Sequence, residues 1–152
     1  MLSPAILIAA IFSSPMAPHG KSAHARLEAV ESRVAKEKLV LADPKTSLRA
    51  DLENELAAID WRAERVGAPF VVRAVLAEAE SSVLRDGTHA SCTVEIVIRE
   101  SNGAILGTVR GRAAGDDAPG ARAALELGVL EAAAESASKA VPEAVRRSRA
   151  AR

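Results

Sequence analysis

The clearest pattern in the chain is the alternation of apolar and polar residues between positions 70 and 113. Two dipeptides that favour tight hairpin loops, Asp86-Gly87 and Asn102-Gly103, divide this stretch into three segments rich in β-branched residues. Alternation with a period of two is typical of strands that bury one face. The pattern therefore predicts a three-stranded antiparallel meander, with strands over about 70–83, 89–100 and 104–113.

Two-residue loops would also fix which residues of neighbouring strands lie opposite each other. On the outer face this register places Glu95 between Glu78 and Arg110, so an ion pair across the strands is expected. A shift of one residue would bury Glu95, so the pattern specifies its own pairing. The expected inner-face pairs are Ile98 with Gly107, Ile96 with Val109, Val94 with Gly111 and Cys92 with Ala113 around the second loop, and Val75 with Ile98, Ala77 with Ile96 and Ala79 with Val94 around the first.

Two segments beside this meander have apolar residues at helical spacing. The first, residues 44–60, begins at Asp43-Pro44, a favourable N-cap and first helical residue. The second, residues 118–141, has Asp117 as its expected N-cap, and Pro142 is expected to end or kink it. Both helices packed on the sheet give an α+β two-layer sandwich. Their apolar stripes are Leu48, Leu52, Leu56 and Ile59 in the first helix and Leu127, Leu130, Ala134, Ala137 and Val141 in the second.

The segments that flank this α/β domain, residues 43–141, differ from it in composition. Residues 1–25 contain an apolar run too short to span a bilayer and end in Ala23-His24-Ala25, a small-x-small motif typical of signal-peptide cleavage. We expect a signal peptide or a disordered apolar N-terminus there, and no stable membrane span after cleavage. Residues 26–42 are predicted to form a charged amphipathic helix, and residues 142–152 a basic tail.

Charge and composition narrow the classes of function. The chain has 20 Lys plus Arg and 20 Asp plus Glu, so no net charge attracts it to nucleic acid. Aromatic residues make up 2% of the chain, too few for platforms on which bases stack. A nucleic-acid partner is therefore not expected, and nothing in the sequence identifies a cofactor or a small-molecule ligand.

Side chains with catalytic potential are few. Cys92 and His89 are three residues apart on a predicted strand, so their side chains would point to opposite faces. Cys92 is therefore interpreted as a buried, inert thiol. Glu78 and Glu95 could act as acid and base or bind a cation, but Arg110 beside Glu95 favours a row of ion pairs. No catalytic or metal-binding residue is assigned.

The outer face of the meander is the predicted partner-binding surface. It is expected to be apolar at one end and charged at the other, and either the predicted helix 26–42 or a partner protein would cover the apolar end. The third strand is also an edge to which a partner strand could add, guarded by its outward-pointing arginines. The candidate partner-binding residues are Phe70, Val72, Leu76, Val97, Leu106, Arg110 and Arg112.

A resemblance to known proteins rests on the span from Asp43 to Val141. The strand "APFVVRAVL", the turn and strand at 102–107 and the "GRA" at 111–113 are similar to small α/β domains of bacterial envelope proteins. These include penicillin-binding-protein activator lipoproteins, the curli-secretion lipoprotein and the amino-terminal domain of the Tol-system propeller protein. The chain differs from them in lacking a lipid-attachment cysteine and a clear leading "VAVLPF" strand. Members of the group are non-catalytic accessory or assembly proteins, and the resemblance implies that class.

The functional expectation combines these observations. We expect a non-catalytic, exported cell-envelope accessory or assembly factor, periplasmic or secreted, that acts by binding an envelope protein. A cytosolic adaptor domain with an uncleaved N-terminus is the alternative, and an enzyme is a more distant one.

Overall fold

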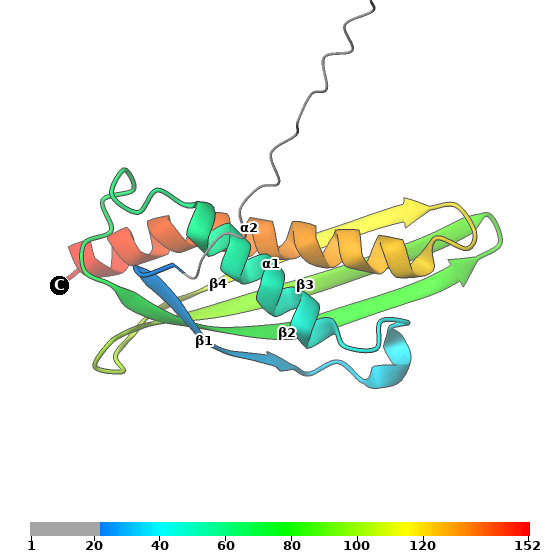
Figure 1. The fold of residues 1–152 in the computed structure, drawn as a ribbon, viewed down its shortest axis with the longest axis horizontal. Helices are drawn as coiled ribbons and strands as arrows, with labels where there is room; N and C mark the ends of the chain where they lie inside the picture. The colour runs from blue at the N-terminus through cyan, green and yellow to red at the C-terminus, as the bar shows by residue number, and fades with distance from the viewer. Residues whose placement is uncertain (1–21) are drawn as a thin grey trace, which may run out of the picture.

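The computed structural model describes residues 22–152, which form four strands and two α-helices. The strands form one mixed sheet in the order β1-β2-β3-β4, in which β1 is parallel to β2 and the other pairs are antiparallel. Both helices cover the same face of the sheet, which gives a two-layer α+β architecture (Figure 1). The predicted meander is therefore incomplete, because a fourth strand joins it. In chain order the elements are β1 (Ala25–Ser32), the 3-10 turn η1 (Lys36–Lys38), α1 (Pro44–Ala58), β2 (Phe70–Leu84), β3 (Gly87–Glu100), β4 (Ile105–Asp117) and α2 (Arg122–Ala150).

The pairing of β3 with β4 follows the sequence prediction over most of its length. Val94 lies opposite Gly111, and Glu95 lies opposite Arg110. The register changes only beside the turn, where Arg99 lies opposite Ile105. Asn102-Gly103 therefore marks the hairpin as predicted, but the two-residue loop is wrong: the backbone N of Glu100 donates to the carbonyl O of Ala104 at 2.8 Å, so the loop spans residues 101–103.

The two helices bury their predicted stripes against the sheet and each other. Asp43 caps α1 by accepting a hydrogen bond from the backbone N of Thr46 at 3.2 Å, and the first three leucines of the α1 stripe are buried. In α2 the predicted stripe is buried except for Leu127, which is 44% exposed. The N-cap of α2 is Ala121 rather than Asp117, because β4 extends to Asp117.

The segment predicted as a charged helix, residues 26–42, contains β1 and η1 instead. Leu27 and Val30 are three residues apart, a spacing typical of a helix, yet both pack on the core because β1 has a bulge at Glu28. β1 pairs in parallel with the first half of β2. The chain thus has a leading strand, which the spacing of its apolar residues concealed.

The register predicted around Asp86-Gly87 is wrong for two reasons. Leu84 pairs with Gly87, so the loop begins one residue earlier than expected, and a β-bulge at Ala77 shifts the pairing again. Because adjacent side chains of a strand point to opposite faces, the bulge exchanges the faces of the first half of β2. The observed inner-face pairs are Val72 with Ile98, Ala74 with Ile96, Leu76 with Val94 and Ala79 with Cys92.

The predicted basic tail, residues 142–152, is almost entirely the last part of α2. The helix passes through Pro142, which is buried, and continues to Ala150. Arg146 donates to the carbonyl O of Glu64 at 2.8 Å, and Arg149 donates to the carbonyl O of Ala68 at 2.7 Å. These arginines hold the connection between α1 and β2, which gives the basic segment a structural role.

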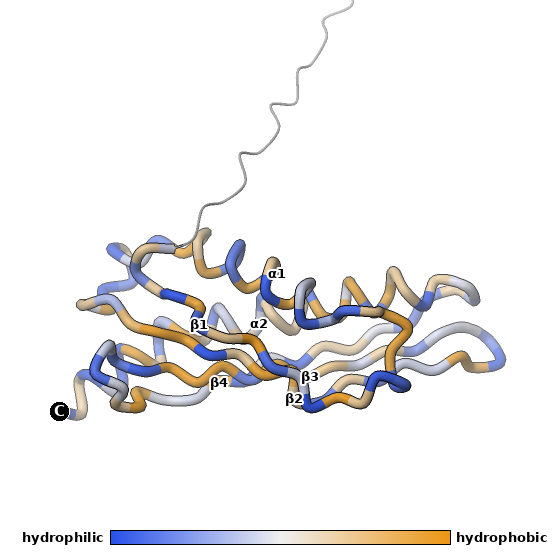
Figure 2. The backbone as a smooth tube through the Cα atoms, turned by 60° about the horizontal axis from the view of Figure 1, so that its bottom comes forward, coloured by the Kyte–Doolittle hydropathy of each residue, from blue (hydrophilic) through white to orange (hydrophobic). Residues whose placement is uncertain are grey.

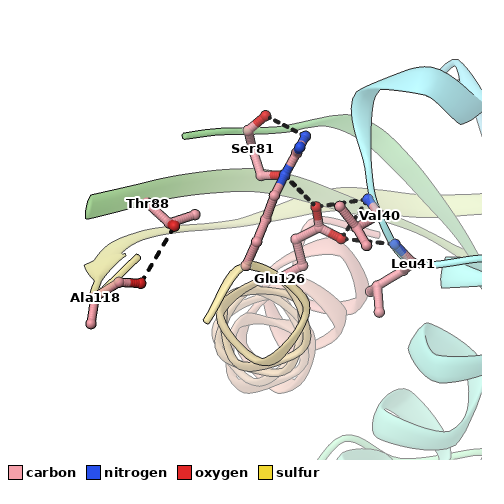
Figure 3. A network of polar contacts seen from close by, with 7 residues as sticks. Val40, Leu41, Ser81, Thr88, Ala118 and Glu126 are labelled. Atoms are coloured by element: carbon pink, nitrogen blue, oxygen red, sulfur yellow. Dashed lines mark hydrogen bonds and ion pairs between the residues drawn. The ribbon is translucent and has the colours of Figure 1, made fainter. Parts of the chain in front are cut away.

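Glu126 of α2 ties the segment before α1 to the sheet (Figure 3). Its side chain accepts hydrogen bonds from the backbone N of Val40 at 2.9 Å, from the backbone N of Leu41 at 3.0 Å and from the Ser81 hydroxyl. The Nε of Arg122 lies 3.6 Å from a Glu126 carboxylate oxygen. A buried carboxylate with this many donors is well satisfied, so the network is structural.

The folded domain begins before the predicted boundary at residue 26. Ala25 is 2% exposed, and the backbone N of Phe70 donates to the carbonyl O of His24 at 2.9 Å. The His24 ring stacks on Trp61, and burial lowers the pKa of His24. Cleavage directly before Arg26 would remove these contacts. The rest of the predicted signal peptide lies outside the described residues.

Within residues 22–152, neither helix combines the length and the apolar character needed to cross a bilayer.

Candidate protein-binding face

The sheet face opposite the helices is covered by no second layer within residues 22–152 (Figure 2). We call this surface the open face. All four strands contribute side chains to it, and their order across the sheet follows from the strand register. The open face includes Arg26, Ala29 and Glu31 from β1, Val71, Arg73, Val75 and Glu78 from β2, Thr93, Glu95, Val97 and Arg99 from β3, and Ile105, Thr108, Arg110 and Arg112 from β4.

Only part of the predicted partner-binding set lies on the open face. Val97, Arg110 and Arg112 point there, as expected. The others belong to the core, those of β2 because the bulge at Ala77 turns its first half over. The predicted residues that are buried are Phe70, Val72 and Leu76 of β2 and Leu106 of β4.

Long charged side chains shield the apolar residues of the open face. Val75 lies in one row with Glu31 and Glu95 and is 4% exposed, although no layer covers it. Aliphatic parts of charged side chains commonly cover small apolar neighbours in this way while their heads stay in water. Val75 is therefore buried without either of the two expected covers, a helix at 26–42 or a partner protein, whereas Val71 and Val97 remain half-buried.

Ion pairs cross the open face from strand to strand. Pairs in this environment contribute roughly 0–1 kcal/mol each, so they set the pattern of charge more than the stability. The pair between β3 and β4 is the one that the sequence predicted. The pairs are Arg110 with Glu95 at 2.8 Å, Arg112 with Glu78 at 3.7 Å and Arg73 with Glu31 at 3.7 Å.

Glu78 and Glu95 do not lie opposite each other, contrary to the predicted register. Glu78 lies opposite Thr93, and Glu95 lies opposite Val75, because the pairing shifts at the bulge. Each carboxylate contacts its own arginine. The shared acid and base or cation site considered for this pair therefore does not form.

Two arginines of the open face carry buried donors without an acceptor. The Nε atoms of Arg73 and Arg99 are buried and have no hydrogen-bond partner within the described residues. Arg99 lies opposite Val71 and Arg73 opposite Val97, so the two are diagonal neighbours on adjacent strands. Arg73 was not among the predicted partner-binding residues because the predicted register turned it toward the helices. An arginine directed into a core is unfavourable, and that conflict was the available signal for a bulge.

A groove of about 600 Å³ lies at the other end of the open face, beyond the end of β1. Arg33 and Lys38, from the segment that follows β1, line one side of it, and Glu78, Thr93 and Arg112 belong to the strands beneath. The lining mixes both signs of charge, so it favours no ligand of a single charge.

Cys92 and His89 lie on opposite faces, as the sequence predicted. The Sγ of Cys92 donates to the carbonyl O of Val129 at 3.4 Å, and burial raises the pKa of Cys92 to about 12. The thiol is therefore protonated and inert at neutral pH. His89 lies 2.8 Å from Asp116. Across residues 22–152, no group of three or more His, Cys, Asp or Glu side chains is placed to hold a metal ion.

Comparisons with known proteins relate the chain to others by fold. No family model and no curated protein matches the sequence. A presumed lipoprotein from Caulobacter crescentus has a similar structure, with a TM-score of 0.50 and 16% identity over 85% of this chain and 93% of that one. PelC from Paraburkholderia phytofirmans, solved as a dodecamer, has a TM-score of 0.45 and 18% identity over 84% of this chain and 89% of that one. A minor lipoprotein from Acinetobacter baumannii has a TM-score of 0.42 and 11% identity over 76% of this chain and 92% of that one.

Proposed function

We propose that this chain is a non-catalytic accessory or assembly protein of the bacterial cell envelope that binds another protein through its open face. The observation that carries the proposal is the uncovered sheet face, on which half-buried valines lie opposite Arg73 and Arg99, whose buried Nε atoms have no acceptor within residues 22–152. Interfaces between proteins are enriched in arginine and pair a small apolar centre with a polar rim. The open face has this composition.

The envelope location has separate support. The N-terminal sequence contains an apolar run between Leu2 and Phe12, which is typical of export signals. The fold agrees with this location, since it is also the fold of a presumed lipoprotein from Caulobacter crescentus. Neither observation identifies the partner.

The location is tested on the full chain produced in its native host, by cell fractionation and by the mass of the purified protein. We expect the protein in the envelope fraction, with an N-terminus that precedes His24, since His24 and Ala25 belong to the fold. An intact Met1 in the cytosolic fraction would contradict export and favour the cytosolic adaptor.

Binding is tested by placing a photoreactive amino acid at single positions and irradiating intact cells. Thr108 and Val97 probe the open face, and Ala132 and Ser136, exposed on α2, serve as matched controls on the opposite side. We expect a discrete cross-linked product from the open-face positions only. Products from the α2 positions alone, or from none of the four, would contradict the proposed binding face.

A further inference from the structure

Three arginines gather at the end of the open face nearest the β3–β4 turn. Arg26 and Arg99 lie on either side of Val71 in one row across β1, β2 and β3, and Arg73 lies in the next row of β2. We call these three the arginine triad. The three arginine positions therefore flank one partly buried valine, Val71, and a second, Val97, lies opposite Arg73.

The arginine triad has more donors than the described residues satisfy. Arg73 lies 3.7 Å from Glu31, a long contact, and within residues 22–152 neither Arg26 nor Arg99 forms an ion pair. The buried Nε atoms of Arg73 and Arg99 have no acceptor among the described residues. A buried donor without an acceptor is unfavourable, so an acceptor that reached it on binding would recover free energy.

The spacing of the donors matches an extended peptide. Diagonal neighbours on adjacent antiparallel strands are about 7–8 Å apart, which is the relation between Arg73 and Arg99. Residues i and i+2 of a strand are about 7 Å apart and point to the same side. Two carboxylates at that spacing could therefore each reach one guanidinium, and the bonds would be charge-assisted.

From this geometry we infer that the arginine triad binds an acidic, extended segment of a partner protein, with carboxylates at every second residue. This inference rests on the proposed function and specifies its partner. The exposed Glu28 lies at the bulge of β1 between the two triad rows. The paired positions of both rows contain no acidic residue, whereas the following row contains Glu31 and Glu95. An anionic membrane surface fits less well, because these carboxylates would face the same headgroups.

The test uses the purified chain and a fluorescein-labelled octapeptide of alternating Glu and Val, with binding followed by fluorescence anisotropy at low salt. We expect binding that an otherwise identical Gln-Val peptide loses at least about ten-fold. Arg73→Gln and Arg99→Gln should each weaken it by about the same factor. The matched control is Arg110→Gln on the same face. Because Arg110 already pairs with Glu95, this variant should change binding less than about two-fold.

A second measurement needs no variant. The Nε–H resonances of the arginines are followed by ¹⁵N NMR during addition of the Glu-Val peptide to the unaltered protein. Those of Arg73 and Arg99 should shift, while that of Arg110 should stay. Unmoved signals, equal binding of the Gln-Val peptide, or an equal loss in Arg110→Gln would each overturn the inference. Tighter binding to phosphatidylglycerol vesicles, with displacement of the peptide, would overturn it in favour of a membrane surface.

The acidic-peptide site and the proposed function can be disproved separately. If open-face cross-links persist in cells that carry Arg73→Gln or Arg99→Gln, the proposed function stands and the arginine triad is not the contact. If the peptide binds as expected but no open-face position gives a cross-link in cells, the proposed function fails and the acidic-peptide site remains.

Discussion

Gly111 of β4 lies against the backbone of Ala137 in α2. A Cβ atom on Gly111 would be 2.4 Å from the backbone N of Ala137 and 2.0 Å from the carbonyl O of Ala133. Neither atom belongs to a flexible side chain, so the helix itself would have to move. Gly111→Ala should therefore lower the free energy of unfolding by about 1–3 kcal/mol, measured by chemical denaturation.

Gly107 provides the matched control, since it lies on the same strand and the same face. A Cβ atom there would be 4.0 Å from the Cβ of Ala144, an ordinary contact. Gly107→Ala should change the free energy of unfolding by less than about 1 kcal/mol. Equal losses in the two variants would show that α2 does not depend on the close approach at Gly111.

The sequence was sufficient where local signals and alternation agreed. Asn102-Gly103 fixed the pairing of β3 with β4, including the Glu95–Arg110 pair. Asp43 fixed the start of α1 through its hydrogen bond to Thr46. Both predictions depend on neighbours within a few residues or on a short loop.

The sequence misled where a single inserted residue changed the geometry. The bulge at Glu28 gave two strand residues a helical spacing, and the bulge at Ala77 exchanged the faces of half of β2. The only signal of the bulge at Ala77 was the conflict of an arginine, Arg73, directed into the core, and β1 pairs with a strand far away in sequence. The open face was therefore predicted as a surface, but most of its β2 residues were assigned to the wrong side.

Arg149 lies near the end of α2, in the segment that was expected to be a basic tail. Its guanidinium donates to the carbonyl O atoms of Val66 and Ala68 and to the carboxylate of Glu100. Arg149→Met should lower the free energy of unfolding by about 2 kcal/mol, because several acceptors lose their donor at once. Thermal unfolding followed by circular dichroism measures the change.

Arg147 is the comparison for Arg149 on the same turn of helix. Its side chain is 79% exposed and pairs only with Glu143 among the described residues. Arg147→Met should cost less than about 0.5 kcal/mol. Similar losses for both arginines would show a general effect of charge, and not an effect of the specific hydrogen bonds that Arg149 makes.

Glu126 holds the segment that precedes α1 through backbone hydrogen bonds. Glu126→Ala removes the acceptor for the backbone N–H groups of Val40 and Leu41. Both amides should then exchange with solvent at least about ten-fold faster, since a local opening that costs about 1.4 kcal/mol less occurs ten times as often. Hydrogen exchange followed by NMR measures this. Glu80→Ala, at an exposed position, should leave both amides unchanged, and an equal acceleration there would contradict the assignment.

The stability of the protein depends on pH through Asp51, which faces Glu131 of α2. Burial, followed by repulsion from Glu131 and Glu55, raises the pKa of Asp51 to about 6. In the unfolded chain the carboxyl titrates near its ordinary value of 3.8. Between about pH 4 and pH 6 the folded state therefore binds more protons than the unfolded state, and stability falls as the pH rises through this range. The cost of the charged form is then present in full above pH 6.

Asp51→Asn removes this charge, so it should stabilise the protein at pH 8 and have little effect at pH 4, where Asp51 is protonated in the folded state. The expected gain at pH 8 is about 1 kcal/mol, less than the whole pKa shift implies, because Asp51 is partly exposed and solvent screens the repulsion. Chemical denaturation at both pH values measures it. Glu53→Gln, which breaks a 3.6 Å pair with Arg49 on the same helix, should give no gain at pH 8. A gain from Asp51→Asn that is equal at pH 4 and pH 8 would show that packing, and not charge, causes the effect.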